Sequence, residues 1–357
     1  SSIVIEDVGD NCIIKIENGK KVTYCPTLTE DLVEDPTGAN RPVLAEGMIP
    51  ITYDGTNWVK ADEYGAYNEW YDYGNQKWAN AVMVTSTKRD TYMNADVGTT
   101  IPENDILAYY VWIPRYKYKL FNATYKSGTS AQVIDVVFEN GTSTTGTVTC
   151  TYASNGAETC QNKSNGNWYT HPAFTMINAS GNKTELKGIW VGKFETSNTS
   201  SLPKIVPNVS SLAYMSVSKQ FNTSRLMTTT LASTYGTSTN DDSHMMKNME
   251  WGAVAYLSSS IYGRYTNAST CIASGCEVWI NNNSSYTTGC AGSSVSASYA
   301  STCNAWNIAT GVNASTTGNI YGIYDMSGGA WEYVMGNYND TIKKAGFSSM
   351  PAAKYYD

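Results

Sequence analysis

Eight cysteines in 357 residues constrain this chain more than any other feature, because they fall into four pairs that are each close in sequence. An even number of cysteines favours disulfides and an oxidising compartment. No Cys-x-x-Cys spacing occurs, and neither His171 nor His244 has metal-ligand spacing around it, so a metal-site interpretation is weak. The pairs expected from proximity are Cys12–Cys25, Cys150–Cys160, Cys271–Cys276 and Cys290–Cys303.

The first pair brackets a β-hairpin signal. Between Cys12 and Cys25 the residues alternate around an Asn-Gly dipeptide at 18–19, the strongest two-residue turn signal. Counting outward from that turn pairs Glu17 with Lys20. The two cysteines then fall opposite each other at a non-hydrogen-bonded position, where the Cα atoms are close enough for a disulfide.

Charge and composition argue against several classes of function. The net charge is −7 and only 15% of the residues are charged, which does not suit nucleic-acid binding by phosphate neutralisation. No apolar run approaches the ~20 residues that a membrane-spanning helix needs. Tyrosine (27 residues) and tryptophan (10 residues) are abundant, and both suit contact surfaces because each combines an apolar ring with a polar group.

The most specific string lies near the C-terminus, where residues 318–334 read GNIYGIYDMSGGAWEYV. It resembles the G-L-Y-D-M-x-G-N-V-W-E-W signature of formylglycine-generating-enzyme-like domains, a branch of the C-type-lectin fold. Further segments match the family in the same order along the chain. The sequences of these segments are similar to those of prepilin-leader surface proteins of gut Firmicutes. The matching segments are paired early strands at 111–116 and 188–195, a His-Pro segment at 171–174 and a helix at 245–256.

The resemblance implies an α+β protein with a lectin-like domain preceded by small hairpin modules. Residues 1–28 are expected to form the disulfide hairpin, and residues 29–104 a linker, a second hairpin and an aromatic segment. Residues 105–357 are expected to form the lectin-like domain. The second hairpin is predicted at 48–60 around an Asp-Gly turn. The aromatic segment at 64–78 is expected to pack on the main domain rather than form an exposed patch.

The clearest helix is predicted from Ser243, as its N-cap, to Ser258, with Met246 and Met249 on the buried face. Another helix is predicted within residues 215–227.

Relatives continue past a segment like Lys354-Tyr355-Tyr356-Asp357 into a stretch with an R-G-G…S-F-R motif that completes the sheet. This part of the domain is therefore expected to be missing here, or to be supplied by another chain. A missing strand would leave an exposed sheet edge, a ready site for pairing with another chain. Trp251 and Trp331 are expected to share one buried core, and an exposed indole at either position would count against the fold.

Catalysis is poorly supported by the sequence. The enzymatic relatives need cysteines after the W-E-W motif, and no cysteine follows Cys303. Asp325 and Glu332 have no nucleophile beside them, and no nucleophile elbow or phosphate-binding glycine loop occurs. The chain is therefore predicted not to be an enzyme and to require no cofactor. The fold family does allow a structural calcium ion, for which oxygen ligands are offered by Asn240, Asp241 and Asp242.

These observations favour an extracellular or cell-surface binding protein, associated with a pilus and used in adhesion. Its expected partners are a glycan, a host or phage-receptor protein, and other filament subunits through the exposed sheet edge. Contact loops are predicted between residues 262 and 315 and near residues 337–339, because Tyr, Trp, Asn and Ser make adaptable contacts. The residues predicted to contact the ligand are Trp279, Asn281, Asn282, Tyr286, Trp306, Asn337 and Tyr338.

Three other functions stay open. They are a phage tail receptor-binding protein of the same fold, a purely structural filament subunit and, least favoured, an oxidase of the formylglycine-generating type. For Trp279 and Trp306 the competing interpretation is that they are partly buried anchors of their loops.

Overall fold

The computed structural model of this chain describes residues 13–17, 20–24, 34–119, 133–145, 149–152, 158–161, 168–178, 180–265, 276–337 and 345–357. Helices and sheets are mixed throughout these residues, so the α+β class is confirmed. The helices are α1 (Tyr67–Trp70), α2 (Ser86–Met93), α3 (Val217–Arg225), α4 (Ala232–Tyr235) and α5 (Asn248–Ser258).

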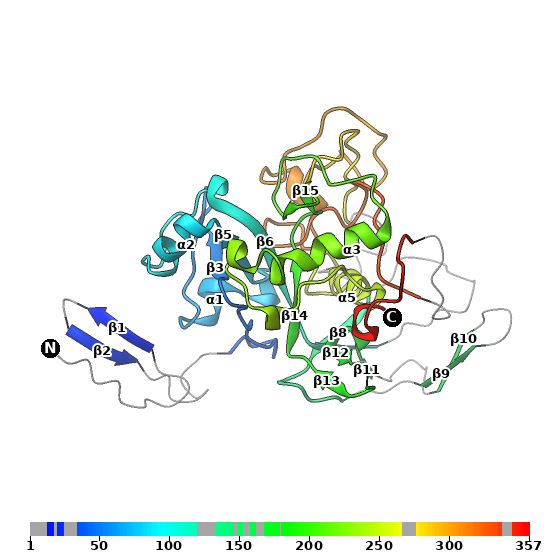
Figure 1. Cartoon of the computed structure of the whole chain (residues 1–357), viewed down its shortest axis with the longest axis horizontal. Coiled ribbons are helices and arrows are strands. Elements are labelled where there is room, and N and C mark those ends of the chain that lie inside the picture. The colour runs from blue at the N-terminus through cyan, green and yellow to red at the C-terminus, as the bar shows by residue number, and fades with distance from the viewer. Residues whose placement is uncertain are drawn as a thin grey trace.

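An antiparallel five-stranded sheet with the order β14-β6-β5-β3-β4 forms the centre of the protein (Figure 1). Its strands are β3 (Ile49–Tyr53), β4 (Trp58–Lys60), β5 (Asn80–Val84), β6 (Ile106–Pro114) and β14 (Gly188–Gly192). Because β6 has neighbours on both edges and is buried along nearly its whole length, its sequence ILAYYVWIP is apolar rather than alternating. The expected pairing of the two early strands is confirmed, with Trp190 opposite Trp112.

Smaller sheets surround this centre. A three-stranded sheet has the order β11-β7-β8, and the others are two-stranded hairpins. The three-stranded sheet contains β7 (Tyr116–Lys119), β8 (Asp135–Phe138) and β11 (Trp168–Thr170). The hairpins are β1 (Ile13–Glu17) with β2 (Lys20–Tyr24), β9 (Thr149–Tyr152) with β10 (Glu158–Gln161), β12 (Thr175–Ile177) with β13 (Lys183–Glu185), and β15 (Ser197–Thr199) with β16 (Leu202–Lys204).

Both predicted N-terminal hairpins are present. In the first, Glu17 pairs with Lys20 as the turn predicts, while Cys12 and Cys25 lie outside the described residues. In the β3–β4 hairpin the carboxylate of Asp54 accepts the main-chain N–H groups of Thr56 and Asn57, at 2.8 and 2.7 Å. These bonds close the turn without help from the rest of the protein, which explains why a short motif could predict it.

The expected division at residue 105 runs through a single sheet, because β3, β4 and β5 precede it and β6 and β14 follow it. The aromatic segment also belongs to this body. Four of its large rings are buried, as the packing interpretation predicts, while Tyr64 at its start is exposed. The indole of Trp70 donates to the carbonyl of Asn80 at 2.8 Å. The buried rings are those of Trp70, Tyr71, Tyr73 and Trp78.

A buried lysine connects the sheet to the 318–334 motif. The ammonium group of Lys193, which directly follows β14, donates to Asn80 Oδ1 at 2.8 Å and to the carbonyls of Ile320 and Gly322 at 2.6 and 2.8 Å. Burial lowers the pKa of this amine. Three hydrogen bonds offset the loss of water around the group, so Lys193 fixes the motif against the end of β14.

The N-terminal end of α5 differs from the prediction. Ser243 is not its N-cap, because the helix begins at Asn248 and the carboxylate of Glu250 accepts the N–H of Lys247 at 2.8 Å. Met249 is 39% exposed, so its assignment to the buried face is wrong. The second predicted helix is present as α3, and Ser216 caps it by accepting the N–H of Lys219.

The prediction of a shared tryptophan core is wrong. The side chain of Trp331 is 92% exposed, and Trp251 is half-buried. Gly328 and Gly329 precede Trp331 with φ angles of 81° and 75°, which only glycine adopts readily, and they turn the chain out of the core before the tryptophan. The exposed indole counts against the lectin-like assignment.

Candidate functional site: a loop tyrosine surface and a methionine-lined cleft

The loops of residues 276–337 gather at one end of the protein, around β15 (Figure 1). They contain little regular structure, and polar side chains hold them in place. Asp325 is central: its carboxylate accepts the side-chain amide of Asn281 at 2.8 Å and the N–H groups of Gly289 and Glu195 at 2.9 and 3.2 Å. One buried carboxylate therefore connects two loops to the segment that follows β14.

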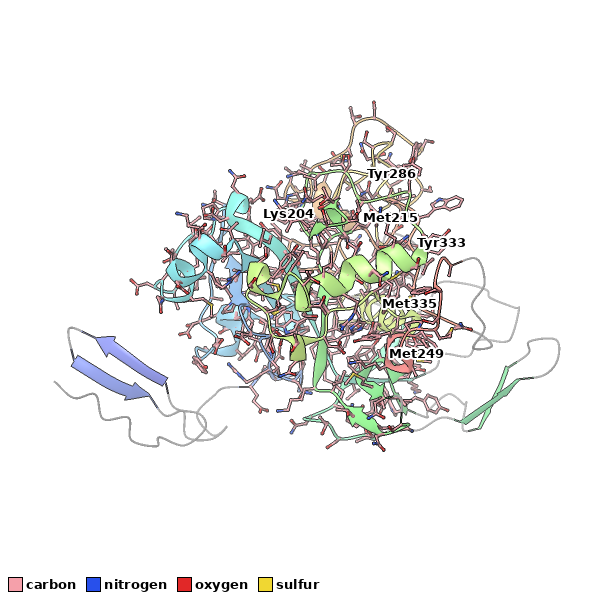
Figure 2. The ribbon with its side chains drawn as sticks, viewed as in Figure 1. Lys204, Met215, Met249, Tyr286, Tyr333 and Met335 are labelled. Carbon is pink, nitrogen blue, oxygen red and sulfur yellow. A yellow bond between two sulfur atoms is a disulfide. The ribbon has the colours of Figure 1, made fainter. Side chains whose placement is uncertain are left out.

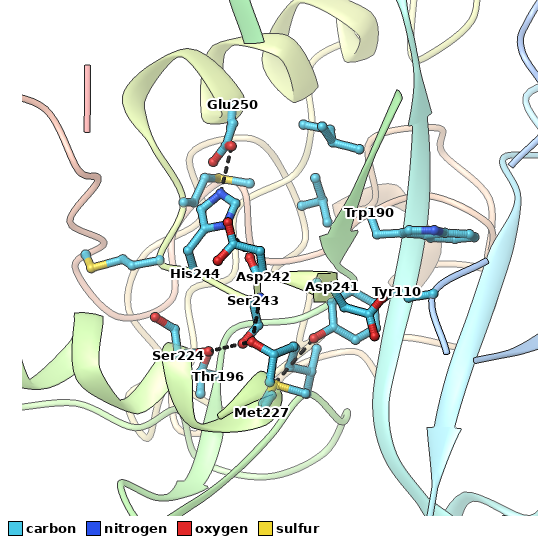
Figure 3. Close-up of a pocket in the computed structure, with 18 of the residues that line it drawn as sticks. Tyr110, Trp190, Thr196, Ser224, Met227, Asp241, Asp242, Ser243, His244 and Glu250 are labelled. Carbon is cyan, nitrogen blue, oxygen red and sulfur yellow. Dashed lines mark hydrogen bonds and ion pairs between the residues drawn. The ribbon is translucent and has the colours of Figure 1, made fainter. Parts of the chain in front are cut away.

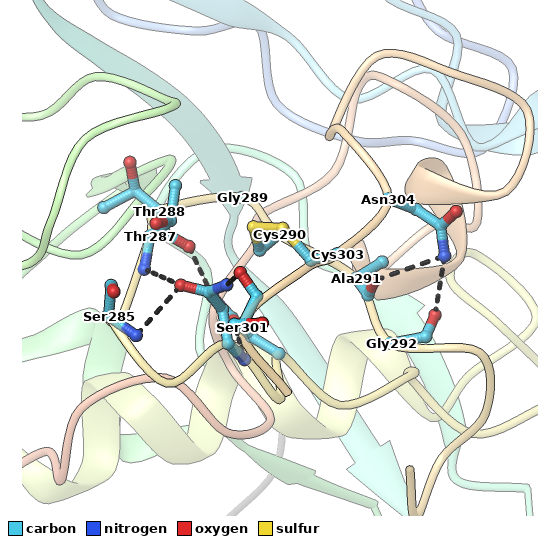
Figure 4. Close-up of a disulfide and its surroundings, with 12 residues drawn as sticks. Ser285, Thr287, Thr288, Gly289, Cys290, Ala291, Gly292, Ser301, Cys303 and Asn304 are labelled. Carbon is cyan, nitrogen blue, oxygen red and sulfur yellow. Dashed lines mark hydrogen bonds between the residues drawn. A yellow bond between two sulfur atoms is a disulfide. The ribbon is translucent and has the colours of Figure 1, made fainter. Parts of the chain in front are cut away.

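A disulfide adds a covalent constraint to these loops (Figure 4). Cys290 and Cys303 are bonded as predicted, with their Cα atoms 5.5 Å apart. Beside it, the side-chain amide of Asn304 donates to the carbonyls of Ala291 and Gly292 at 3.3 and 3.2 Å. The bond and these contacts fix both ends of the segment between the two cysteines.

The other predicted pairs are described less completely. Cys276 is disulfide-bonded, while its expected partner Cys271 lies outside the described residues. Cys150 is opposite Cys160 in the register of β9 and β10, as the prediction requires.

Three tyrosines, two of them exposed, lie on these loops and on the neighbouring segment before α3, and we call them the tyrosine surface. Tyr214 is 96% exposed and Tyr299 62% exposed, with the half-buried Tyr286 in contact with both. The ring centroids of Tyr286 and Tyr299 are 6.3 Å apart. Hydrogen bonding among the three side chains raises the pKa of Tyr214 and of Tyr286. Figure 2 shows Tyr286 among the loops at the top of the molecule.

The backbone of this surface is strained at two positions. Tyr214 and Tyr286 have φ angles of 59° and 52°, in the left-handed region that costs a residue other than glycine about 1–2 kcal/mol. The surrounding hydrogen bonds hold one of them there. The N–H and hydroxyl of Ser211 both donate to the carbonyl of Tyr286 at 2.9 Å, and the N–H of Tyr286 donates to Asn283 at 3.0 Å. Such strain is typical of functional sites, where geometry matters more than local stability.

Most other residues predicted to contact a ligand have structural roles. Trp306 is only 1% exposed and stacks on Trp58 with centroids 6.4 Å apart, so its assignment to a contact surface is wrong. Asn281 and Asn282 are also buried, and their amides donate to other loop residues, so they too are wrong as surface contacts. Trp279 is half-buried, as the loop-anchor interpretation expects.

The second predicted contact segment is only partly described. The N–H of Asn337 donates to the carbonyl of Asp357 at 2.7 Å, and Tyr338 lies outside the described residues. Of the predicted residues, Tyr286 is therefore the one that reaches an exposed aromatic surface. Sequence reasoning missed Tyr214 and Tyr299, because no pattern in their neighbourhood distinguishes an exposed tyrosine from a buried one.

The predicted calcium ligands are engaged elsewhere. Asp242 pairs with Arg225 and Lys354 at 2.6 and 2.8 Å, and its Oδ1 also accepts the hydroxyl of Tyr355. The carboxylate of Asp241 accepts the N–H of Ser238 at 2.7 Å. These contacts do not fit a calcium site at 240–242. Across the described residues no group of three or more His, Cys, Asp and Glu side chains is placed to share a metal ion.

A cleft with a volume of about 970 Å³ lies between β14 and the segments around α3 and α5 (Figure 3). Figure 3 shows Trp190 and Tyr110 on one side and His244 and Glu250 on the other. All five residues of β14 line the cleft, as do eight methionines. Half of these methionines are buried in the core behind the cleft wall, and the other half are partly exposed and flexible enough to adapt to an occupant. These methionines are Met48, Met83, Met176, Met215, Met227, Met245, Met246 and Met326.

The His244–Glu250 pair in this cleft is not arranged as a catalytic relay. Nε2 of His244 and Oε1 of Glu250 are 2.8 Å apart, and Nδ1 of His244 lies 2.8 Å from the carbonyl oxygen of Asp242. Burial lowers the pKa of His244, but the charge of Glu250 outweighs that effect and the net pKa is raised. The nearby hydroxyl of Ser243 donates to the carbonyl of Ser224 at 2.7 Å rather than to the imidazole.

A carboxylate at the motif end of the cleft is incompletely paired. Glu195 is 9% exposed, and its Oε2 accepts the hydroxyl of Ser211 and the N–H of Ala330. Its Oε1 is buried and has no hydrogen-bond partner. Burial and the charges of Asp325 and Glu332 raise the pKa of Glu195. Sequence reasoning missed this residue, because its importance depends on where three distant carboxylates meet.

Comparison with known proteins adds no family assignment: no protein-family description matches the chain, and no curated protein is significantly similar to it in sequence. Within the described part of the chain, no helix has the length and apolar character needed to cross a membrane.

Proposed function

We propose that this chain is a non-enzymatic binding protein of the cell surface or extracellular space, which presents the tyrosine surface to a neutral ligand. The observation that carries the proposal is the tyrosine surface, in which Tyr214 and Tyr286 have left-handed backbones on loops held by hydrogen bonds and a disulfide. Exposed aromatic rings on rigid loops lose little conformational entropy on binding, and aromatic anchors dominate many contact energies.

The charge around this surface supports a neutral ligand. Between residues 276 and 337 the only charged residues are Glu277, Asp325 and Glu332, and Asp325 is buried. Tyrosine rings without neighbouring charge suit the faces of sugar rings and the apolar parts of protein surfaces. A glycan or a receptor protein therefore fits better than an anionic polymer. Disulfides in this region are typical of secreted proteins.

The lectin-like architecture belongs to the same proposal. It is supported by the order of the sequence motifs and by the pairing of β6 with β14, and it is weakened by the exposed Trp331. A lectin-like platform would place its irregular loops at one end of a sheet, which is where residues 276–337 lie (Figure 1).

The test is a glycan array and a receptor-protein pulldown with the wild type and a Tyr214→Ala/Tyr299→Ala double variant. Both side chains are mostly exposed, so the variant keeps its fold, and Tyr64→Ala is the matched control because Tyr64 is an exposed tyrosine outside these loops. We expect the double variant to lose roughly tenfold or more in affinity and the control to lose none. Unchanged binding by the double variant would contradict the proposal.

A further inference from the structure

Strand β14 forms one edge of the central sheet, and its outer side is open. The N–H of Lys193 donates to Tyr109 of β6, and the carbonyl of Lys187 accepts from Arg115 at the other end. Successive residues of a strand direct their main-chain groups to opposite edges. The groups of Gly188, Trp190 and Gly192 therefore face away from β6, and no described residue bonds to them.

This open edge does not face bulk solvent but lies along the cleft. Four of its five residues are only partly exposed, with Val191 buried. Across the cleft from it are the segments around α3 and α5 (Figure 3). An occupant of this cleft can satisfy the main-chain groups of β14 and bury apolar side chains at the same time, which is what an added β-strand does.

The charge of the cleft indicates what the added strand carries. Six carboxylates and two lysines line it. Three of the carboxylates are already paired: Glu185 with Arg115, Asp242 with Arg225 and Lys354, and Glu250 with His244. Glu195 follows β14 by three residues, after a bend at residues 193–194, and lines the same cleft as the strand. Its buried Oε1 has no partner, and no described cation forms an ion pair with it.

We propose that the cleft binds an extended segment of another polypeptide, which adds to β14 as a strand and places an arginine or lysine against Oε1 of Glu195. Main-chain hydrogen bonds to Gly188, Trp190 and Gly192 supply affinity that depends little on sequence. The basic side chain supplies specificity, because a cation that displaces the proton held by Glu195 forms a charge-assisted pair with it, which neutral and acidic side chains cannot form. The exposed indole of Trp331 lines the same cleft and is free to pack over the bound strand.

The surroundings of Glu195 also favour a basic side chain at this position. Asp325 and Glu332 lie close enough to raise the pKa of Glu195, so a cation placed there gains from three carboxylates. Ser211, which donates to Glu195, also holds the carbonyl of Tyr286. The cleft and the tyrosine surface are thus adjacent but distinct, and neither proposal needs the other.

The test begins with a displayed library of random nine-residue peptides selected on the wild-type protein. We expect enriched peptides to contain one arginine or lysine together with alternating apolar residues. Selection on Glu195→Gln removes the enrichment of the basic residue, whereas Glu103→Gln, an exposed carboxylate outside the cleft, leaves it unchanged. An absence of enrichment, or the same basic preference with Glu195→Gln, would overturn the proposal.

Measurements on one enriched peptide then separate the main-chain contacts from the charge. We expect N-methylation of alternate peptide amides to abolish binding in one of the two registers. Glu195→Gln should lower the affinity for the arginine-containing peptide roughly tenfold or more, and should leave the affinity for the analogue with glutamine in place of arginine unchanged. Gly192→Pro removes one of the N–H groups of β14 that face away from β6, and it should lower the affinity for both peptides. This variant keeps the test informative if Glu195→Gln folds poorly. Binding that tolerates N-methylation in both registers would contradict strand addition.

A sedimentation experiment without peptide identifies the source of the strand. A monomer at micromolar concentration agrees with a separate partner, whereas a dimer that the enriched peptide dissociates would mean that a second copy fills the cleft. Loss of glycan binding in the tyrosine variant with peptide binding intact would separate this proposal from the proposed function.

Discussion

The central sheet and the loops of residues 276–337 are both ordered, but by different forces. In the sheet, strands such as β6 bury nearly every side chain, and the apolar pattern of the sequence determines their place. In the loops, Asp325 and the amides of Asn281 and Asn304 provide the contacts, together with the Cys290–Cys303 disulfide. The difference teaches that a polar, irregular region can be a rigid platform when its buried polar groups are paired.

The largest expected effect comes from the residue that joins the two regions. Trp306 belongs to a loop but lies in the core, where it stacks on Trp58 and meets Phe194 edge to face. Trp306→Ala is therefore expected to destabilise the protein by ~3–5 kcal/mol in chemical denaturation. A loss below about 1 kcal/mol would show that the loops do not depend on the core.

The disulfide should have the next largest effect. The cysteines are separated by 13 residues, and closing a loop of that size stabilises a protein by about 3 kcal/mol in the chain-entropy model. We expect Cys290→Ser/Cys303→Ser to lose that much free energy of unfolding under oxidising conditions. The reduced wild type is the control and should be as unstable as the variant. Equal stability of the oxidised wild type, the reduced wild type and the variant would mean that hydrogen bonds alone order the loops.

Some features of the sheet and the loops could be predicted from the sequence, and others could not. The β3–β4 hairpin and the strand pairing of β6 with β14 follow from short motifs and apolar runs, since local turn bonds and burial determine them. The buried position of Trp306 does not follow, because asparagines at 304 and 307 beside it are typical of an exposed loop and its partner Trp58 is far away in the chain. The exposure of Trp331 was missed because two left-handed glycines redirect the chain just before it.

Glu195 should give a smaller effect that depends on pH. Burial and neighbouring carboxylates raise its pKa, so the folded protein keeps a proton that the unfolded chain has released. Stability at this site is therefore full below the ordinary pKa of 4.5 and falls as the pH rises toward the folded pKa. Glu195→Gln should flatten that decline and stabilise the protein at pH 8 by roughly 1–2 kcal/mol. Melting curves across pH values test this, and a steeper decline in the variant would contradict it.

The smallest expected effect concerns the strained tyrosines. Because Tyr214 has a φ angle of 59° and is almost fully exposed, Tyr214→Gly relieves strain without losing packing. Its unfolding free energy should exceed that of Tyr214→Ala by about 1 kcal/mol, while binding falls equally in both. Equal stability of the two variants in denaturant titrations would show that the backbone at this position is relaxed.

Amide hydrogen exchange tests most directly whether the loops are as rigid as the sheet. We expect the N–H groups of Asn281 and Gly289, which donate to Ser327 and Asp325, to exchange slowly and to approach the protection of Trp112 in β6. Reduction of the disulfide should lower the protection of the loop amides and leave that of Trp112 unchanged. Complete exchange of the loop amides within seconds, with β6 still protected, would contradict a preformed platform.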